Sequence, residues 1–336
     1  MSFIWKSLKW IAALFAILIV VYLLGPRPAK PTFTTPNYTN AASLAELELE
    51  ISKSEATIKG LKPGNEANIV WANPTIKGKT PVVFLYLHGF GASHHEGYPV
   101  DVDLAKRFGC NIFLSRLSEH GIEAGDDNLK KFTADSYAES GERALHIAKQ
   151  LGDSVVILAT SGGAAVALLL ASKHPEIKAL VTYSPAIQIF RKDAAVMSGP
   201  WGLQLARLIT GKNYNDWTMT DGMAPYWTNH QSFEGVVQFS TFLKYANTPE
   251  NFAKIKCPFF MAYYYDDEAH QDFTVSVAAM KEMYAALGTP SSLKREVSIK
   301  NADSHVITSD ITCKLWSKAE AESALFIHDV LGMELK

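Results

Sequence analysis

The chain has 336 residues, a formal net charge of −2 and an apolar fraction of 48%. The near-neutral charge gives no electrostatic basis for binding nucleic acid, because such binding needs clustered Lys and Arg. The length allows one large domain with an insertion or two small domains, and the apolar fraction is sufficient for a large core. The three cysteines lie far apart and fit neither a disulfide framework nor a CxxC metal site, so they are predicted to be buried thiols: Cys110, Cys257 and Cys313.

Residues 1–25 are predicted to form a membrane anchor. Residues 10–24 carry no charge, and Trp5, Trp10 and Tyr22 are suited to the membrane–water interface. A cleaved signal peptide is the alternative, but no Ala-x-Ala site follows at the right distance. Because so little chain precedes the span, we expect a single-pass membrane protein whose catalytic domain is extracytoplasmic.

The rest of the chain is predicted to be a linker followed by one α/β domain. Residues 26–42 are rich in Pro and Thr, which is typical of an exposed linker. Residues 43–336 begin with an amphipathic helix at 43–59 and then alternate strand and helix patterns. This alternation predicts a mainly parallel central sheet with helices on both faces. The strands are expected at 68–72, 81–88, 111–115, 154–159, 178–183, 258–265 and 294–299, and the later helices near 99–108, 133–151, 164–172, 273–287 and 315–331.

The sequence Ala159-Thr160-Ser161-Gly162-Gly163 interrupts an apolar run between a buried strand and a helix. Glycines at this junction allow the backbone to reverse sharply and to approach other atoms closely. A serine on such a turn is typical of a nucleophile elbow, which exposes its oxygen above a sheet. A glycine-rich βα turn of a dinucleotide-binding fold is the alternative, but the Gly-x-Gly-x-x-Gly pattern is absent.

A nucleophilic serine needs a base and an orienting acid, and in a parallel sheet these follow strand ends. His305 follows the last predicted strand and can both accept and return a proton near neutral pH. Asp266 and Asp267 follow the strand that begins at Pro258. We expect Asp267 to orient His305, with Asp266 as the alternative.

The sequence His88-Gly89-Phe90-Gly91 follows a further apolar strand and predicts an oxyanion-binding loop. The backbone N–H groups of Phe90 and Gly162 are the expected donors to the oxyanion. His88 is predicted to brace the loop. Nearby, His94-His95-Glu96 does not suggest a metal site, because adjacent histidines on a loop point apart and no third ligand is evident.

These motifs, LYLHGFGAS, ATSGGA, CPFFMAYYYDD and NADSHVI, occur in an order that resembles the α/β-hydrolase superfamily over residues 68–335. The closest resemblance within it is to the carboxylesterase and monoacylglycerol lipase branch, which includes serine aminopeptidase-like members. Ala159 stands where the usual elbow has glycine, and Glu119 stands where that branch has the first glycine of Gly-His-Gly. The resemblance implies that residues 186–256 form a helical cap.

The resemblance implies a serine hydrolase that cleaves a hydrophobic carboxylic ester without a metal or organic cofactor. Its substrate would be a small ester with an apolar acyl chain. A peptidase or an acyltransferase with the same triad is an alternative, and so is a non-catalytic binding protein on a hydrolase scaffold.

Overall fold

A seven-stranded sheet forms the centre of the computed structural model, which describes residues 2–336. Its strand order is β1-β3-β2-β4-β5-β8-β11; β1 pairs antiparallel with β3, and all other neighbouring strands are parallel. Residues 83–87 of β2 are fully buried without polar alternation, as expected of a strand covered on both faces. The strands are β1 (Asn68–Val70), β2 (Thr80–Leu87), β3 (Asn111–Leu114), β4 (Gly152–Thr160), β5 (Ala179–Tyr183), β8 (Phe259–Tyr263) and β11 (Lys294–Ser298).

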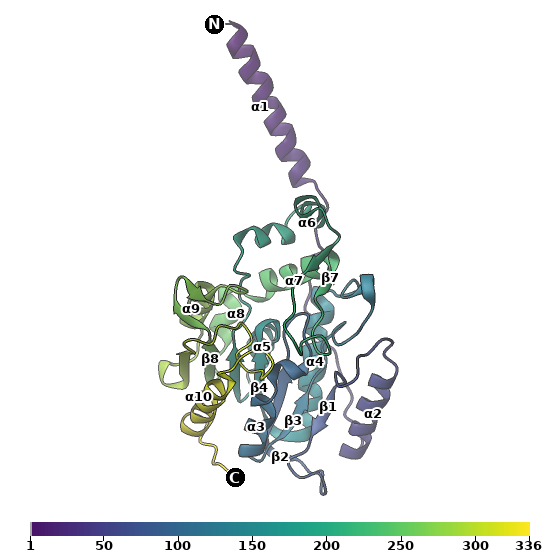
Figure 1. Cartoon of the computed structure of the whole chain (residues 1–336), viewed down its shortest axis with the longest axis vertical. Coiled ribbons are helices and arrows are strands. Elements are labelled where there is room, and N and C mark those ends of the chain that lie inside the picture. Colours follow the sequence, from purple (N-terminus) through teal and green to yellow (C-terminus); the bar gives the residue numbers. More distant parts are fainter. Residues whose placement is uncertain (1) are drawn as a thin grey trace.

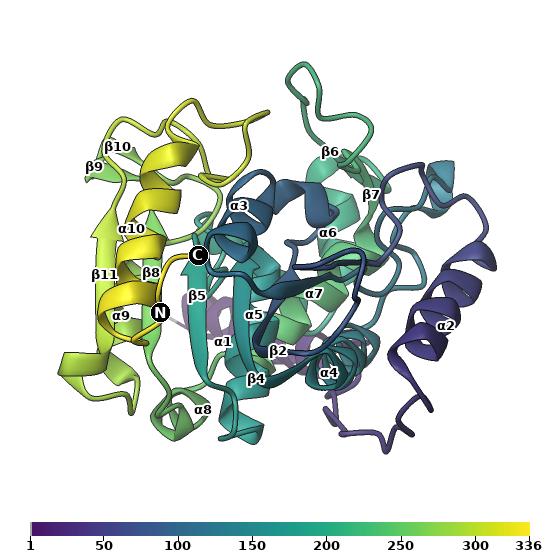
Figure 2. The same cartoon turned by 90° about the horizontal axis from the view of Figure 1, so that it is seen from below.

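Helices cover both faces of this sheet and create two separate cores. Side chains alternate along a strand, so Val83 and Leu85 enter one core while Phe84 and Tyr86 enter the other. The first core is closed by α4 (Ala134–Leu151), α5 (Ser161–Lys173) and α9 (Val277–Ala286), and the second by α3 (Val100–Arg107) and α10 (Trp316–Asp329). Figure 2 shows β11 and α10 at one flank of the molecule and α2 (Leu44–Ala56) at the opposite flank.

The predicted strands and helices of the domain agree closely with these elements. The main difference within them is that α5 begins at Ser161 itself, so the predicted turn is part of the helix start. About half of the segment predicted as a cap is helical, and α7 (Phe233–Ala246) also packs into the main core through the fully buried Phe242. It contains η3 (Lys192–Ser198), α6 (Gly202–Thr210), β6 (Tyr214–Asp216), β7 (His230–Ser232), α7 (Phe233–Ala246) and α8 (Pro249–Lys254).

The first helix, α1 (Ser2–Leu23), projects away from the rest of the chain (Figure 1). Its segment Trp5–Leu23 has a mean hydropathy of 1.9, none of it is buried, and its length suits a membrane span. A signal sequence has the same properties, so these properties do not distinguish an anchor from a cleaved leader.

Residues 26–42 differ from the free linker that their composition predicts. They form no helix or strand, yet they run along α4. The backbone N–H groups of Thr32 and Phe33 both donate to Asp135 Oδ1 at 2.8 Å, and the Phe33 ring packs edge-on against Phe242. Pro and Thr predict exposure, but extended backbone also offers unpaired N–H and C=O groups, which polar side chains of α4 and α5 satisfy here.

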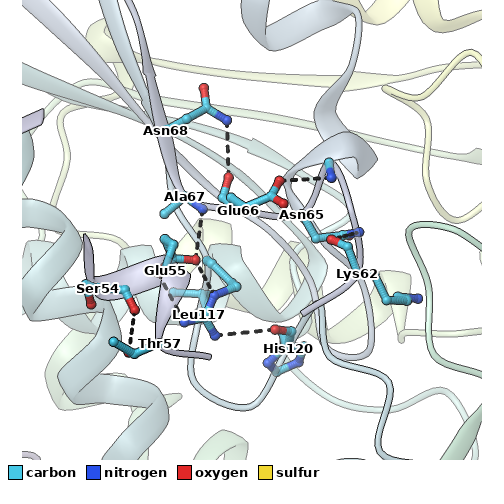
Figure 3. A network of polar contacts seen from close by, with 12 residues as sticks. Ser54, Glu55, Thr57, Lys62, Asn65, Glu66, Ala67, Asn68, Leu117 and His120 are labelled. Atoms are coloured by element: carbon cyan, nitrogen blue, oxygen red, sulfur yellow. Dashed lines mark hydrogen bonds and ion pairs between the residues drawn. The ribbon is translucent and has the colours of Figure 1, made fainter. Parts of the chain in front are cut away.

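A buried ion pair connects α2 to the segment that follows β3. The carboxylate of Glu55 accepts bonds from Arg116 Nε at 2.6 Å and from Arg116 Nη2 at 3.1 Å. Figure 3 shows Glu55 at the centre of this network, where it also accepts the N–H of Ala67. Arg116 in turn approaches the carbonyl oxygen of the buried His120. The pair therefore fixes α2 against the loop that carries His120.

Glu55→Ala is expected to lower the free energy of unfolding by about 3–5 kcal/mol, because it leaves the buried Arg116 guanidinium without its partner. Urea denaturation measures this loss. Asp127→Ala is the matched control, because it breaks the fully exposed Lys130–Asp127 pair and should leave stability almost unchanged. Equal stability of the two variants would contradict the role assigned to the pair.

Candidate functional site

Ser161 lies at the junction of β4 and α5 with a left-handed backbone (φ of +52°). A side chain is unfavourable in this conformation, and such strain concentrates at functional sites. The neighbouring Gly163 lies so close to β2 that an added Cβ would be 2.1 Å from the carbonyl oxygen of Leu87. Only glycine fits there, which explains the interruption of the apolar run and agrees with the predicted elbow.

A chain of two hydrogen bonds runs from the hydroxyl of Ser161 through His305 to Asp272. Its Oγ lies 2.9 Å from His305 Nε2, and His305 Nδ1 lies 2.6 Å from Asp272 Oδ2. His305 is on the loop after β11, and Asp272 is on the segment between β8 and α9. The three side chains thus come from the β4–α5 junction and from two loops, all at the carboxyl ends of the parallel strands, where a site is expected in an open α/β sheet.

Asp267, the acid predicted from the sequence, does not contact His305. Its exposed carboxylate binds His270 Nδ1 at 2.9 Å and the Ala269 N–H at 2.8 Å. Asp266, the alternative, accepts the N–H of Asn301 instead. The assignment of Asp267 is therefore corrected to Asp272. The physical reason is a small hairpin, β9 (Tyr265–Asp267) with β10 (His270–Gln271), that carries the chain back before it reaches His305.

Asp272 has a local signal that the sequence prediction missed. Its Oδ1 accepts the N–H groups of Thr274 at 2.8 Å and Val275 at 3.1 Å, which is a side-chain turn typical of Asp shortly before a helix. These bonds leave Oδ2 free to face His305. The orientation of the buried carboxylate is thus fixed by the backbone N–H groups of the residues that follow it.

Burial and neighbouring charges shift the pKa of His305 in opposite directions. Burial lowers the pKa of His305, but the charge of Asp272, its hydrogen bond and the charge of Glu96 together raise the pKa above its ordinary value. The pKa of Asp267 is lowered by its hydrogen bond to His270, so that carboxylate belongs to a separate surface pair.

The structure places the backbone nitrogen of Phe90 beside Gly162, the two residues expected to bind an oxyanion. A Cβ added to Gly162 would lie 3.1 Å from the nitrogen of Phe90 and 3.0 Å from the Phe239 ring. Gly162 is in the first turn of α5, where N–H groups have no acceptor within the helix. The Phe90 ring stacks on Phe239 of α7 with centroids 4.4 Å apart. The loop after β2 is therefore packed against the cap.

Known proteins are similar to this chain. Residues 82–217 match the family described as alpha/beta hydrolase fold. A thermostable monoacylglycerol lipase from Bacillus sp. (strain H-257) is 30% identical over 118 residues, which are 35% of this chain and 46% of that protein. A structure from work on the metagenome-derived lipolytic enzymes LipS and LipT has a TM-score of 0.63 and 17% identity, covering 80% of this chain and 99% of its own. The chain has the α/β-hydrolase fold.

A second solved structure agrees with that fold. A soluble variant of monoglyceride lipase from Saccharomyces cerevisiae has a TM-score of 0.57 and 14% identity, covering 88% of this chain and 98% of its own. These matches confirm the predicted fold and the resemblance to the lipase and esterase branch. The chain spans about half the length of the curated lipase it matches.

His88 braces the loop after β2, as expected. The N–H of Leu117 donates to His88 Nε2 at 3.0 Å, so the ring proton is on Nδ1, which donates to the carbonyl oxygen of Gly89 at 3.0 Å. Complete burial holds the pKa of His88 well below its ordinary value. The ring is therefore a neutral structural group.

Glu96 is a second residue of the site that the sequence did not predict. Its carboxylate accepts the N–H of Gly89 at 2.6 Å beneath the loop that carries Phe90. Burial raises the pKa of Glu96 to about 7, despite the opposing hydrogen bond from Gly89. The described residues hold no cluster suited to a metal ion. Glu96, which follows two histidines in the sequence, is thus a buried acid beneath the loop that carries Phe90.

Glu96→Gln is expected to move the acidic limb of the kcat/KM profile to lower pH. His305 can act as a base only when neutral, so activity is lost as the pH falls through its pKa. The ionised form of Glu96 raises that pKa. Because the pKa of Glu96 is itself about 7, Glu96 is only partly ionised in this range, and its removal should lower the pKa of His305 by a small amount. Ester hydrolysis measured across the acidic range tests this shift.

Glu320→Gln is the control, since Glu320 is a buried acid on α10 that pairs with Arg107. Its acidic limb should match that of the unaltered chain. A Glu96→Gln variant with lower activity but an unchanged limb would show that Glu96 only supports the loop.

Proposed function

We propose that the protein is a serine hydrolase that cleaves a carboxylic ester through an acyl-enzyme, with Ser161 as nucleophile, His305 as base and Asp272 as orienting acid. The observation that supports it best is the continuous hydrogen-bonded chain from Ser161 Oγ through His305 to Asp272, starting at a left-handed serine. This is the geometry that activates a serine on unrelated folds.

Each step of this reaction uses a group already in position. Ser161 Oγ attacks the carbonyl carbon while its proton passes to His305 Nε2. The N–H groups of Phe90 and Gly162 donate to the resulting oxyanion. His305 then protonates the leaving alcohol, and the acyl group remains on Ser161. Water attacks the acyl-enzyme, gives its proton to His305 and releases the carboxylic acid as Ser161 recovers its proton.

The surroundings of Ser161 favour an ester with an apolar acyl chain. Phe90 and Phe239 stack beside the proposed oxyanion donors. On the His305 side, Trp227 and Met223 of the cap form an apolar cluster with Ala92 and the neighbouring Val306. Binding sites for small molecules are mainly apolar and aromatic with few polar groups. The similarity to a monoacylglycerol lipase supports the same class of substrate.

Paired substrates with the same acyl group test the reaction class. We expect the purified chain to hydrolyse p-nitrophenyl esters, with a preference for chains longer than acetyl, and to leave the matching p-nitroanilides nearly untouched. Faster turnover of aminoacyl anilides would indicate a peptidase. Product esters formed in the presence of added alcohols would indicate an acyltransferase, and binding without turnover would indicate a non-catalytic protein.

The N-terminal helix supports a second part of the proposal, a single-pass anchor with an extracytoplasmic catalytic domain. The span Trp5–Leu23 has the length and hydropathy that insertion needs. The full chain should remain with membranes after carbonate extraction, and added protease should digest the domain once the outer barrier is opened. A soluble chain beginning near residue 26 would instead show a cleaved leader.

A further inference from the structure

The end of α1 is attached to the cap rather than to the sheet domain. Trp201 donates its indole N–H to the carbonyl oxygen of Val21 at 3.0 Å. Its backbone N–H donates to the carbonyl oxygen of Pro26 at 2.7 Å. The Val21 carbonyl needs such a donor, because the N–H of Gly25 binds Tyr22 instead.

Packing reinforces these hydrogen bonds. A Cβ added to Gly25 would lie 1.8 Å from Trp201 Nε1, so the indole occupies the space that a side chain would need. Gly25 is buried, whereas Leu24 beside it is highly exposed. The Trp201 ring thus sits directly on the backbone where the proposed span ends.

Trp201 is also the residue from which α6 starts. Figure 1 shows α6 at the foot of α1, viewed nearly along its own axis, so α6 runs across the direction of α1. Leu208 and Ile209 of α6 are 78% and 69% exposed, while Gly202 and Ala206 are buried. An amphipathic helix that lies crosswise beside the end of a membrane span has the geometry of an interfacial helix.

We propose that Trp201 clamps the cap to the end of the anchor, so that Leu208 and Ile209 of α6 lie in the interface of the same lipid bilayer that α1 spans. The occupant of this apolar surface is lipid, because α6 lies at the foot of the exposed span of α1 (Figure 1) and is attached to its end through Trp201. The proposal rests on the anchor and the hydrolase activity proposed above, and it adds where the substrate comes from. The cap reaches the site through the stacking of Phe239 on Phe90, so an ester dissolved in the bilayer is presented next to the oxyanion donors.

Fluorescence quenching in the full chain tests the contact with lipid. A nitrobenzoxadiazole probe is placed on Leu208→Cys in phosphatidylcholine nanodiscs that contain lipid spin-labelled near its headgroup. Cys257→Ser removes the partly exposed thiol, and Cys110 and Cys313 are buried. The control is Ile76→Cys, an equally exposed apolar position (74%) in the loop between β1 and β2.

We expect strong quenching of the probe at position 208 and little at position 76. Equal quenching at the two positions would overturn the proposal, and so would an intact mass showing that the membrane-bound chain begins beyond residue 25. Trp201→Ala should lower the quenching at position 208 toward the control level while α1 stays inserted. Unchanged quenching in that variant would overturn the role of the clamp.

Kinetics give a second readout. The double variant Leu208→Ser and Ile209→Ser should raise KM for a long-chain ester held in the bilayer by about ten- to a hundredfold, because it loses apolar contact with lipid. Its kcat and KM for a soluble short-chain ester should not change. An equal effect on both esters would count against docking. A chain that hydrolyses neither ester would refute the proposed function, while the quenching experiment would still decide the membrane contact.

Discussion

Ser161→Ala is expected to lower kcat for ester hydrolysis by about 10⁴–10⁶-fold, the range found when a triad member is removed. The change deletes the Oγ atom that lies 2.9 Å from His305 Nε2. It leaves the proposed oxyanion donors, the N–H groups of Phe90 and Gly162, in place. Alanine has the same difficulty with a left-handed backbone as serine, so the fold and its stability should be nearly unchanged. Stopped assays with p-nitrophenyl esters, together with urea denaturation, measure both properties.

Ser172→Ala is a matched control at the other end of the same helix. The hydroxyl of Ser172 only donates to the carbonyl oxygen of Leu169 within α5, so its loss should leave kcat close to that of the unaltered chain. Hydrolysis by pure Ser161→Ala at a rate comparable to this control would refute Ser161 as nucleophile.

Asp272→Asn is expected to lower kcat by about 10⁴-fold, because an amide at this place favours the wrong tautomer of His305. The carboxylate now holds the proton of His305 on Nδ1 and leaves Nε2 free to accept the proton of Ser161. The asparagine is close in shape, and its side-chain oxygen can still accept the turn bonds from Thr274 and Val275. The loss should therefore appear in kcat rather than in expression or stability.

Asp267→Asn distinguishes the structural assignment from the one suggested by sequence. It disturbs only the exposed pair with His270 and a local turn, so kcat should change by less than about threefold, as is usual for exposed pairs. A large loss with Asp267→Asn and a small one with Asp272→Asn would reverse the assignment.

Sequence reasoning succeeded where local patterns determine the structure. Unbroken apolar runs located the strands. Ser161 and His305 were proposed because each lies on the segment that directly follows a strand, and the structure places them 2.9 Å apart. The glycines at 162 and 163 marked the turn because they interrupt an apolar run. These patterns lie in neighbouring residues of the chain, which a sequence displays directly.

The features that the sequence did not reveal depend on contacts between distant segments. Asp272 escaped prediction because a two-strand hairpin displaces it from the end of β8. Glu96 was weighed only as part of a metal site with His94 and His95, and only the folded loop shows that it is buried under Gly89. The course of residues 26–42 along α4 could not be read from a Pro- and Thr-rich composition, since polar side chains more than 100 positions away hold it.

The docking of residues 26–42 has a consequence for the order of events during synthesis. The N–H groups of Thr32 and Phe33 bind the carboxylate of Asp135, which is 103 and 102 positions later in the chain. The carbonyl oxygen of Val21 binds the indole of Trp201, which is 180 positions later. The ribosome therefore releases the start of the chain long before its partners, and Phe33 stays unburied in the meantime. Contacts of such long range are slow to form and follow the local ones. We expect the start of the chain to stay undocked until α4 and α6 have been synthesised, after the local contacts of α1 and α2 have formed.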